Sequence, residues 1–260
     1  MDTCTLHRGR APLLISLPHN GTALPEALRP RLTDSALRLA DTDWHVDRLY
    51  AFARDLGASI LVPRFSRYVV DLNRPPDDVS LYPGQNTTGL VPLRQFSGAA
   101  VYRDGAAPDA AEVAERVQRY WQPYHAVLQD ELARLRAAHG RVVLWEGHSI
   151  RSECPFLFDG RLPDFNLGTA AGASCATGLQ QRLGAVLAAQ SRYSHVTNGR
   201  FKGGYITRHY GRPDEGVDAV QLELAQCNYM DEDSFAYDEA RARPTQELIR
   251  RLLQQCLGAS

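Results

Sequence analysis

The sequence predicts an α/β fold, arranged as a three-layer αβα sandwich around a mixed, mostly parallel sheet. Two observations support this prediction. Apolar runs typical of buried parallel strands, such as PLLISL at 12–17 and RVVLW at 141–145, alternate along the chain with longer segments whose apolar residues recur at helical spacing. The 260 residues contain no Pro-, Gly- or Ser-rich linker, so we expect one domain covering residues 1–260.

The expected elements follow one another in the order of such a fold. We expect strands at 12–17, 59–62, 68–72, 141–145 and 217–224, and helices at 43–56, 108–139, 176–189 and 239–257. Gly57 ends the first helix, and Pro123 is expected to kink the second. The stretch from 73 to 102 is rich in Pro, Gly and Thr and has no periodicity, which predicts a long functional or mobile loop.

Composition and charge exclude several classes of partner. Lys plus Arg total 29 against 30 for Asp plus Glu, and neither sign forms a long block, which argues against binding to nucleic acid or to an anionic membrane. The first residues, MDTCTLHRGR, lack the apolar core of a signal peptide, and no apolar run approaches the roughly 20 residues that span a bilayer, so we expect a cytoplasmic protein. The five cysteines form no CxxC pair and are expected to be reduced. The expected partner is a small molecule.

Three short polar clusters directly follow apolar runs: PHNG at 18–21, DLNR at 71–74 and EGHS at 146–149. Because ligands in α/β sheets collect beyond the carboxyl ends of the strands, we expect these clusters to converge on one site. His19 and His148 offer imidazoles, and we expect them to hold one divalent metal ion, with zinc as the first choice and iron, cobalt or manganese as alternatives. A lone histidine after a strand is more often structural, but the pair favours a metal site.

The third metal ligand is expected from the acidic run DTDWHVD at 41–47. On a helix Asp43 and Asp47 share one face, which can point back toward the end of the first strand. Asp41 or Asp43 can equally serve as the N-cap of the helix, where a side-chain acceptor and a negative charge are both favoured. Asp47 lies one turn inside the helix, beyond capping range, so Asp47 is the preferred ligand.

Arginines near these clusters are candidates for binding a substrate carboxylate. Asn73 and Arg74 precede Pro75 and Pro76, which keep the chain extended and display the guanidinium. A surface salt bridge is the alternative for any arginine, but a guanidinium beside metal-binding histidines is well placed for a bidentate contact with a carboxylate. Weaker candidates of the same kind are Arg67, Arg151 and Arg208.

Glu223 is the candidate general base. In VQLEL at 220–224 alternate residues face opposite sides of a strand, so Gln221 and Glu223 lie on the side away from the apolar residues. A carboxylate in that position either pairs with a structural cation or takes a proton from an attacking water. The company of two histidines favours the second role.

Several longer motifs resemble one known family. They are LPHNGTALP, LADTDWHVDRLY, FSRYVVDLNRPP, LYPGQNTTGLVP, WEGHSIRSECPFLFDGRLPDFNLG, FKGGYITRHYGRP and VQLELAQCNYMDE. Through them the chain resembles the N-formylglutamate amidohydrolases over nearly its whole length. This family is similar in fold to zinc carboxypeptidases and aspartoacylases, and the resemblance therefore implies a zinc-carboxypeptidase-like, phosphorylase/hydrolase-like sandwich.

The resemblance also implies roles for individual residues. Carried over, the metal ligands are His19, Asp47 and His148, Glu223 assists the attacking water, and Asn73 with Arg74 binds a substrate carboxylate. The peptidases have their acidic ligand three residues after the first histidine, where this chain has Thr22, so the later acidic cluster has to replace it.

The implied reaction is metal-assisted hydrolysis of N-formylglutamate to formate and glutamate, the last step of a histidine degradation route. The second carboxylate of this substrate needs a further cation, for which Arg67, Arg151, Lys202 and Arg208 are candidates. The alternatives are a related amidohydrolase acting on another N-acyl amino acid or on a peptide end, and a non-catalytic protein that binds carboxylates.

Overall fold

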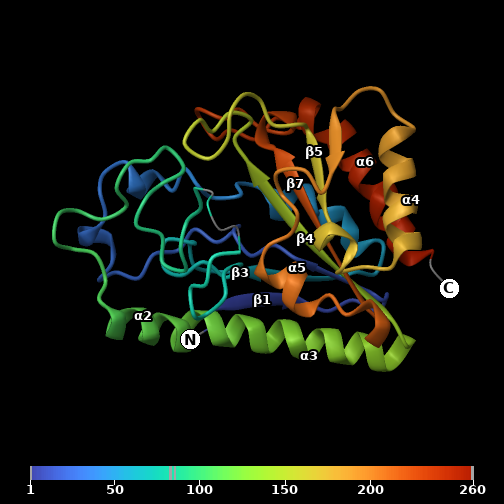
Figure 1. The fold of residues 1–260 in the computed structure, drawn as a ribbon, viewed down its shortest axis with the longest axis horizontal. Coiled ribbons are helices and arrows are strands. Elements are labelled where there is room, and N and C mark those ends of the chain that lie inside the picture. Colours follow the sequence, from blue (N-terminus) through green and yellow to red (C-terminus); the bar gives the residue numbers. More distant parts are fainter. Residues whose placement is uncertain (1, 82–83, 85, 259–260) are drawn as a thin grey trace.

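The computed structural model describes residues 2–81, 84 and 86–258, and it contains one seven-stranded sheet (Figure 1). The strands are β1 (Cys4–His7), β2 (Leu13–Ser16), β3 (Ser59–Pro63), β4 (Val142–Ile150), β5 (Phe165–Gly168), β6 (His195–Thr197) and β7 (Val217–Ala225). Their order in the sheet is β1-β3-β2-β4-β7-β5-β6. Neighbouring strands from β3 to β7 run parallel, as do β5 and β6, while β1 and β5 run antiparallel to β3 and β7. The predicted mixed, mostly parallel sheet is confirmed.

Helices cover both faces of this sheet. They are α1 (Val46–Leu49), α2 (Ala110–Arg116), α3 (Gln122–His139), α4 (Thr177–Ala188), α5 (Tyr205–Tyr210) and α6 (Glu239–Leu257). One buried core joins the sheet to α1, α4 and α6, and a second core joins the opposite face to α3 and α5. Figure 1 shows α2 and α3 running along one side of the sheet and α4 and α6 packed together on the other. The three-layer arrangement predicted from the sequence is therefore present.

Two predicted helices depart from regular α-helical geometry. The segment expected to be helical over 43–56 contains only the short α1 and a 3-10 turn, Ala51–Arg54, because His45 adopts a left-handed conformation with φ of 61°. The expected helix over 108–139 is continuous but contains a π-helical turn, Val117–Trp121, directly before α3. Such turns insert an extra residue and rotate the side chains that follow.

The predicted strand at 68–72 is wrong. This segment is buried but irregular, and several of its carbonyl oxygens are bonded by side chains instead of by a neighbouring strand. Arg116 donates to Val69 O at 3.1 Å, and the ring of His125 lies 2.9 Å from Leu72 O. The apolar residues at 68–72 therefore predict correctly that the segment is buried. A buried segment need not pair with a strand when side chains bond its backbone groups.

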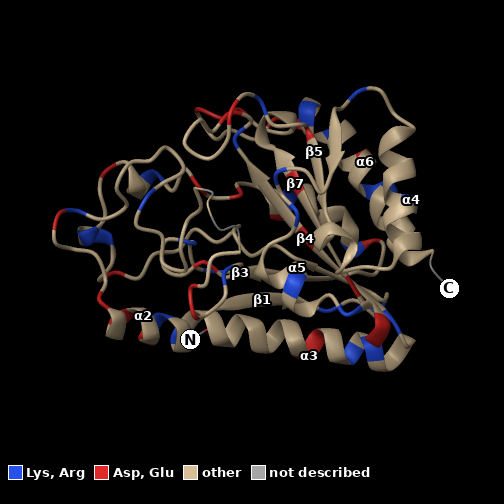
Figure 2. Ribbon diagram, in the orientation of Figure 1, with Lys and Arg blue, Asp and Glu red and all other residues tan. Residues whose placement is uncertain are grey.

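Four elements have no counterpart in the prediction: β1, β5, β6 and α5. The strands among them contain only three or four residues, too few for a periodicity to be visible. Lys and Arg are interspersed with Asp and Glu along the ribbon (Figure 2). Among the described residues, the helices are all too short or too polar to cross a lipid bilayer.

Candidate active site

The centre of the site is the second half of β4 and β7, where the face toward α3 and α5 changes from apolar to polar. Near the start of the strands this face carries buried apolar residues, Val142 and Leu144 on β4 and Val217 and Ala219 on β7. Further along, the same alternation presents Glu146, His148, Gln221 and Glu223, all of them buried. His148 and Glu223 are register partners on the two adjacent strands. The polar end of this one sheet face is therefore the floor of the site.

The sequence predicts His148 just after a strand that ends at residue 145. In the structure His148 lies within β4, because β4 extends through the whole EGHS cluster. Gly147 makes this possible. A Cβ atom at Gly147 would lie 2.7 Å from Leu17 and 2.9 Å from the ring of Tyr50, so the space on the far side of the strand is already filled by core side chains. The glycine accommodates the core behind the site and not a ligand in front of it.

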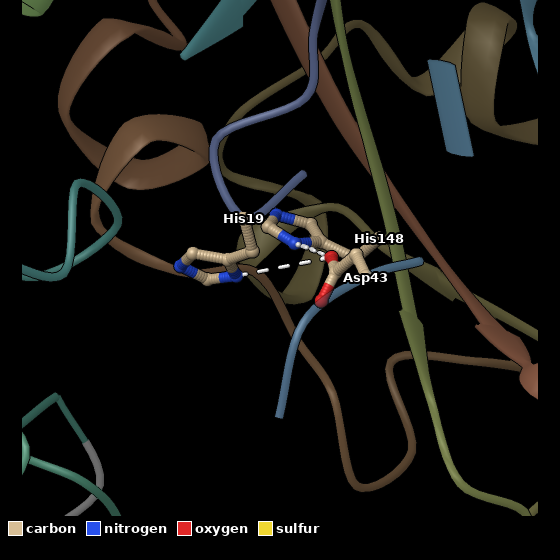
Figure 3. A group of neighbouring side chains, drawn as sticks. All are labelled: His19, Asp43 and His148. Atoms are coloured by element: carbon tan, nitrogen blue, oxygen red, sulfur yellow. Dashed lines mark hydrogen bonds and ion pairs between the residues drawn. The ribbon is translucent and has the colours of Figure 1, made fainter. Parts of the chain in front are cut away.

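Three side chains from distant parts of the chain meet here. His19, Asp43 and His148 are buried, and one donor atom from each lies within 4.8 Å of the others. Oδ2 of Asp43 lies 3.1 Å from Nδ1 of His148 and 3.8 Å from Nδ1 of His19 (Figure 3). The two imidazole nitrogens and the carboxylate oxygen face a common point, a donor set that can hold a divalent metal ion. The predicted convergence of the first and third polar clusters is confirmed in the geometry.

The structure corrects the preference for Asp47 over Asp43. Asp47 is exposed on α1, where it borders a separate surface groove. Asp43 precedes the helix instead of capping it, and its backbone N–H donates to His19 O at 3.1 Å. Its carboxylate also accepts from the backbone N–H of Ser149 at 3.1 Å. A helix from residue 43 would place both aspartates on one face, but the left-handed turn at His45 separates them.

A second carboxylate fixes the orientation of His19. Nε2 of His19 lies 2.7 Å from Oδ1 of Asp71, whose other oxygen accepts from Arg67 Nη2 at 2.6 Å. Burial alone would raise the pKa of Asp71, but His19 and Arg67 hold that pKa well below its usual value. Because ionised Asp71 can only accept, this contact requires the hydrogen of His19 on Nε2. Burial lowers the pKa of His19 and so favours the neutral ring, in which Nδ1 keeps a lone pair for a metal ion. A carboxylate behind a histidine ligand is the usual arrangement in metal sites, so this contact fits the donor set.

His148 is oriented by Asn73 and Glu146. Nε2 of His148 lies 3.1 Å from Nδ2 of Asn73 and 3.8 Å from Oε1 of Glu146. The other oxygen of Glu146 accepts from Thr207 Oγ1 at 2.9 Å, while Oε1 is buried with no hydrogen-bond partner among the described residues. Sequence reasoning missed Glu146, although it stands two residues before His148 and therefore shares its face of the strand.

Glu223 lies in the same cavity as the metal-ligand candidates. Burial raises its pKa to about 8, although the neighbouring His148 acts in the opposite direction. A carboxyl group whose pKa lies near neutrality can both accept and release a proton, which is what a general base in a hydrolase has to do. The structure places Glu223 beside the metal-ligand candidates, and its role as the base stays a prediction.

Only some of the candidate cations from the sequence line the cavity. Arg67 and Arg74 line it, and so does Arg200, which sequence reasoning missed. Arg151, Arg208 and Lys202 are not among the lining residues. Arg151 instead bonds Glu232 O and Asp233, and Arg208 donates to Gly203 O. The only sequence signal for Arg200 was its place next to the FKGG motif at 201–204.

Hydrogen bonds from neighbouring residues hold both the side chain and the backbone of Arg74 in place. Its guanidinium donates to Thr88 O at 2.8 Å and Thr88 Oγ1 at 3.3 Å. The indole N–H of Trp121, at the end of the π-helical turn, donates to Arg74 O at 3.0 Å. On the next residue back, Asn73 Oδ1 accepts from Ile206 N at 2.8 Å. A Cβ at Gly204 would lie 2.3 Å from the amide of Asn73, so this glycine permits the close approach.

Comparisons with known proteins find relatives over nearly the whole chain. A family model described as N-formylglutamate amidohydrolase matches residues 11–230. The chain is 57% identical to the N-formylglutamate deformylase of Pseudomonas aeruginosa, covering 99% of this chain and 97% of the relative. It is 54% identical to the N-formylglutamate deformylase of Pseudomonas putida, covering 98% and 95%. A crystal structure of N-formylglutamate amidohydrolase from Ralstonia eutropha superposes with a TM-score of 0.81 at 28% identity, covering 99% of this chain and 96% of the other.

Proposed function

The chain belongs to the N-formylglutamate amidohydrolase family, and we propose that it hydrolyses N-formyl-L-glutamate to formate and L-glutamate with the help of one divalent metal ion, zinc being the first choice. One observation carries the proposal: a single cavity is lined by His19, Asp43 and His148, by Glu223, and by the guanidinium groups of Arg67, Arg74 and Arg200. This cavity therefore combines a metal donor set, a candidate base and cations for an acidic substrate. The two Pseudomonas relatives are named N-formylglutamate deformylases, which supports the choice of a formyl group.

The residues of the chain divide the reaction between them. A divalent ion bound to His19, Asp43 and His148 would act as a Lewis acid toward the formyl oxygen and would acidify a water molecule. Glu223 takes the proton from the attacking water and delivers it to the nitrogen of the leaving glutamate as the C–N bond breaks. Arg74 holds a substrate carboxylate through its guanidinium, which is presented by Thr88 and by the contact of Trp121 with its backbone.

The raised pKa of Glu223 suits this cycle. A base that is too weak would not take a proton from water, and one that is too strong would not return it to the amine. The wall formed by Phe96, Ile150, Leu157 and Phe201 is apolar, and it lowers the local dielectric around the charged groups on the floor of the cavity. The place in histidine degradation and the cytoplasmic location stay predictions from the sequence.

Formate release and metal content test the proposal together. The purified protein is assayed with the N-formyl, N-acetyl and N-succinyl derivatives of glutamate and aspartate, before and after dialysis against a chelator and with single metals added back. We expect N-formyl-L-glutamate to have the highest kcat/KM, activity to disappear with the metal, and zinc to restore it. His148→Ala should lose both bound metal and activity. Full activity in the chelated protein, or in the His148→Ala variant, would refute the proposed site.

A further inference from the structure

The proposed substrate carries two carboxylates, and the cavity holds three arginines that differ in how they are engaged. Arg67 is buried against Asp71, with Nη2 at 2.6 Å from Oδ2, so its charge is already balanced by a carboxylate of the protein. Arg74 donates to Thr88 O, Thr88 Oγ1 and Asn73 O, which are all uncharged oxygens. The positive charge of Arg74 is thus available to a substrate, whereas that of Arg67 serves the metal-ligand group.

Arg200 lies far from Arg74 in the sequence, but both side chains form hydrogen bonds with the segment 86–88. Its Nη2 donates to Asn86 O at 3.3 Å, two residues before the Thr88 that binds Arg74. Asn86, Thr87 and Thr88 all line the cavity together with the two arginines. The segment 86–88 therefore connects two guanidinium groups, one from the 71–74 cluster and one from the segment before α5.

We infer that Arg74 and Arg200 bind the two carboxylates of the substrate, and that Arg200 is the residue that selects an acidic side chain. This inference rests on the proposed function. Asn73 contacts His148 at 3.1 Å, so the adjacent Arg74 is tied to the reacting end of the cavity and binds the α-carboxylate next to the formamide. Arg200 is followed by Phe201, part of the apolar wall, which suits the two methylenes that separate the side-chain carboxylate from Cα.

The test compares substrates that differ only in the side-chain charge. Wild type, Arg200→Gln and Arg200→Lys are assayed with N-formyl-L-glutamate and with N-formyl-L-glutamine, which has the same shape without the carboxylate. For Arg200→Gln we expect kcat/KM on N-formyl-L-glutamate to fall about a hundredfold, mainly through KM, because the side-chain carboxylate loses its charged partner. Activity on N-formyl-L-glutamine should stay within about threefold, and Arg200→Lys should restore part of the preference for glutamate. Arg192→Gln, an exposed arginine outside the cavity, is the matched control.

Binding of the products separates this inference from the proposed function. Calorimetric titration with L-glutamate and L-glutamine does not depend on turnover, so it remains informative even if the formyl group is the wrong acyl group. We expect wild type to bind L-glutamate more tightly than L-glutamine and Arg200→Gln to lose that preference. A preference that survives in Arg200→Gln, an equal loss on both substrates, or the absence of any preference in wild type would each overturn the role of Arg200.

Discussion

Two networks of arginines around buried carboxylates lie on the α3 side of the sheet, and they differ in how completely their polar atoms are bonded. In the first, Glu131 of α3 accepts from Ser59 Oγ at 2.5 Å and from Arg134 Nη2 at 2.6 Å through one oxygen. Its other oxygen accepts from Arg134 Nε at 2.9 Å and lies 3.4 Å from Arg8 Nε. Both oxygens are satisfied, and the network ties α3 to the start of β3.

The second network contains the metal-ligand candidates and is incomplete. Asp71 is fully bonded between His19 and Arg67, but Arg67 Nε and Glu146 Oε1 are buried with no hydrogen-bond partner among the described residues. Leaving such an atom unbonded costs about 1–3 kcal/mol. Burial and charge alone therefore do not mark a site; the second network differs because His19, Asp43, Arg67 and His148 line a cavity.

The largest loss of activity is expected for Asp43→Asn, because Asp43 supplies the only carboxylate in the His19, Asp43 and His148 group. Asp43→Asn removes the anionic donor between the two histidines, and loss of residues behind metal ligands already costs roughly 10- to 100-fold. We therefore expect bound metal and kcat/KM to fall by more than about a hundredfold, since a direct ligand is lost. Metal analysis by mass spectrometry and formate release measure the two quantities.

Asp47→Asn is the matched control, because it makes the same chemical change four residues away on an exposed surface. It should keep the metal and the activity of wild type. A result in which the two variants exchange their behaviour would restore Asp47 as the ligand and would contradict the geometry.

A smaller loss is expected for Glu223→Gln. The amide cannot take a proton, and a general base contributes typically about 10²- to 10⁴-fold, so kcat should fall by that factor. The metal should stay bound, since Glu223 is not part of the His19, Asp43 and His148 group. Single-turnover kinetics with parallel metal analysis distinguish this outcome from a loss of the site. If activity is unchanged, the proton is taken by another group.

The sequence predicted the sheet and the meeting of His19 with His148 because both depend on long apolar runs and on the common edge of parallel strands. It failed at Asp43 because the decision depends on one left-handed residue, His45, which no periodicity records. It missed Glu146 and Arg200 because their roles depend on neighbours that are distant in the chain, Thr207 for one and Asn86 for the other. Short strands such as β5 and β6 were missed for a different reason, because three or four residues are too few to show a periodicity.

The contact between Trp121 and Arg74 gives a prediction of moderate size. Trp121→Phe keeps an aromatic ring against His125, which it stacks at 3.6 Å, but removes the N–H that donates to Arg74 O. One such hydrogen bond is worth about 1 kcal/mol, so KM for N-formyl-L-glutamate should rise roughly fivefold with kcat nearly constant. Steady-state kinetics measure both. A fall in kcat alone would mean that the π-helical turn does not act through Arg74.

The complete network should affect stability and not activity. Glu131→Gln should lower the free energy of unfolding at pH 7 by roughly 1–2 kcal/mol, a value reduced because Arg134 is 38% exposed and its charge is partly screened.

Although burial alone would raise the pKa of Glu131, its bonds to Arg134 and Ser59 hold this pKa below its usual value in the folded protein. The stabilisation by Glu131 is therefore complete above the pKa of the unfolded chain and disappears as the pH falls through the lower pKa of the folded state. Urea unfolding between pH 7 and pH 3 should show the wild-type and Glu131→Gln curves converging in acid, with kcat/KM at pH 7 equal in both. Curves that stay parallel across this range would mean that the carboxylate charge contributes nothing, and the network would then owe its stability to packing alone.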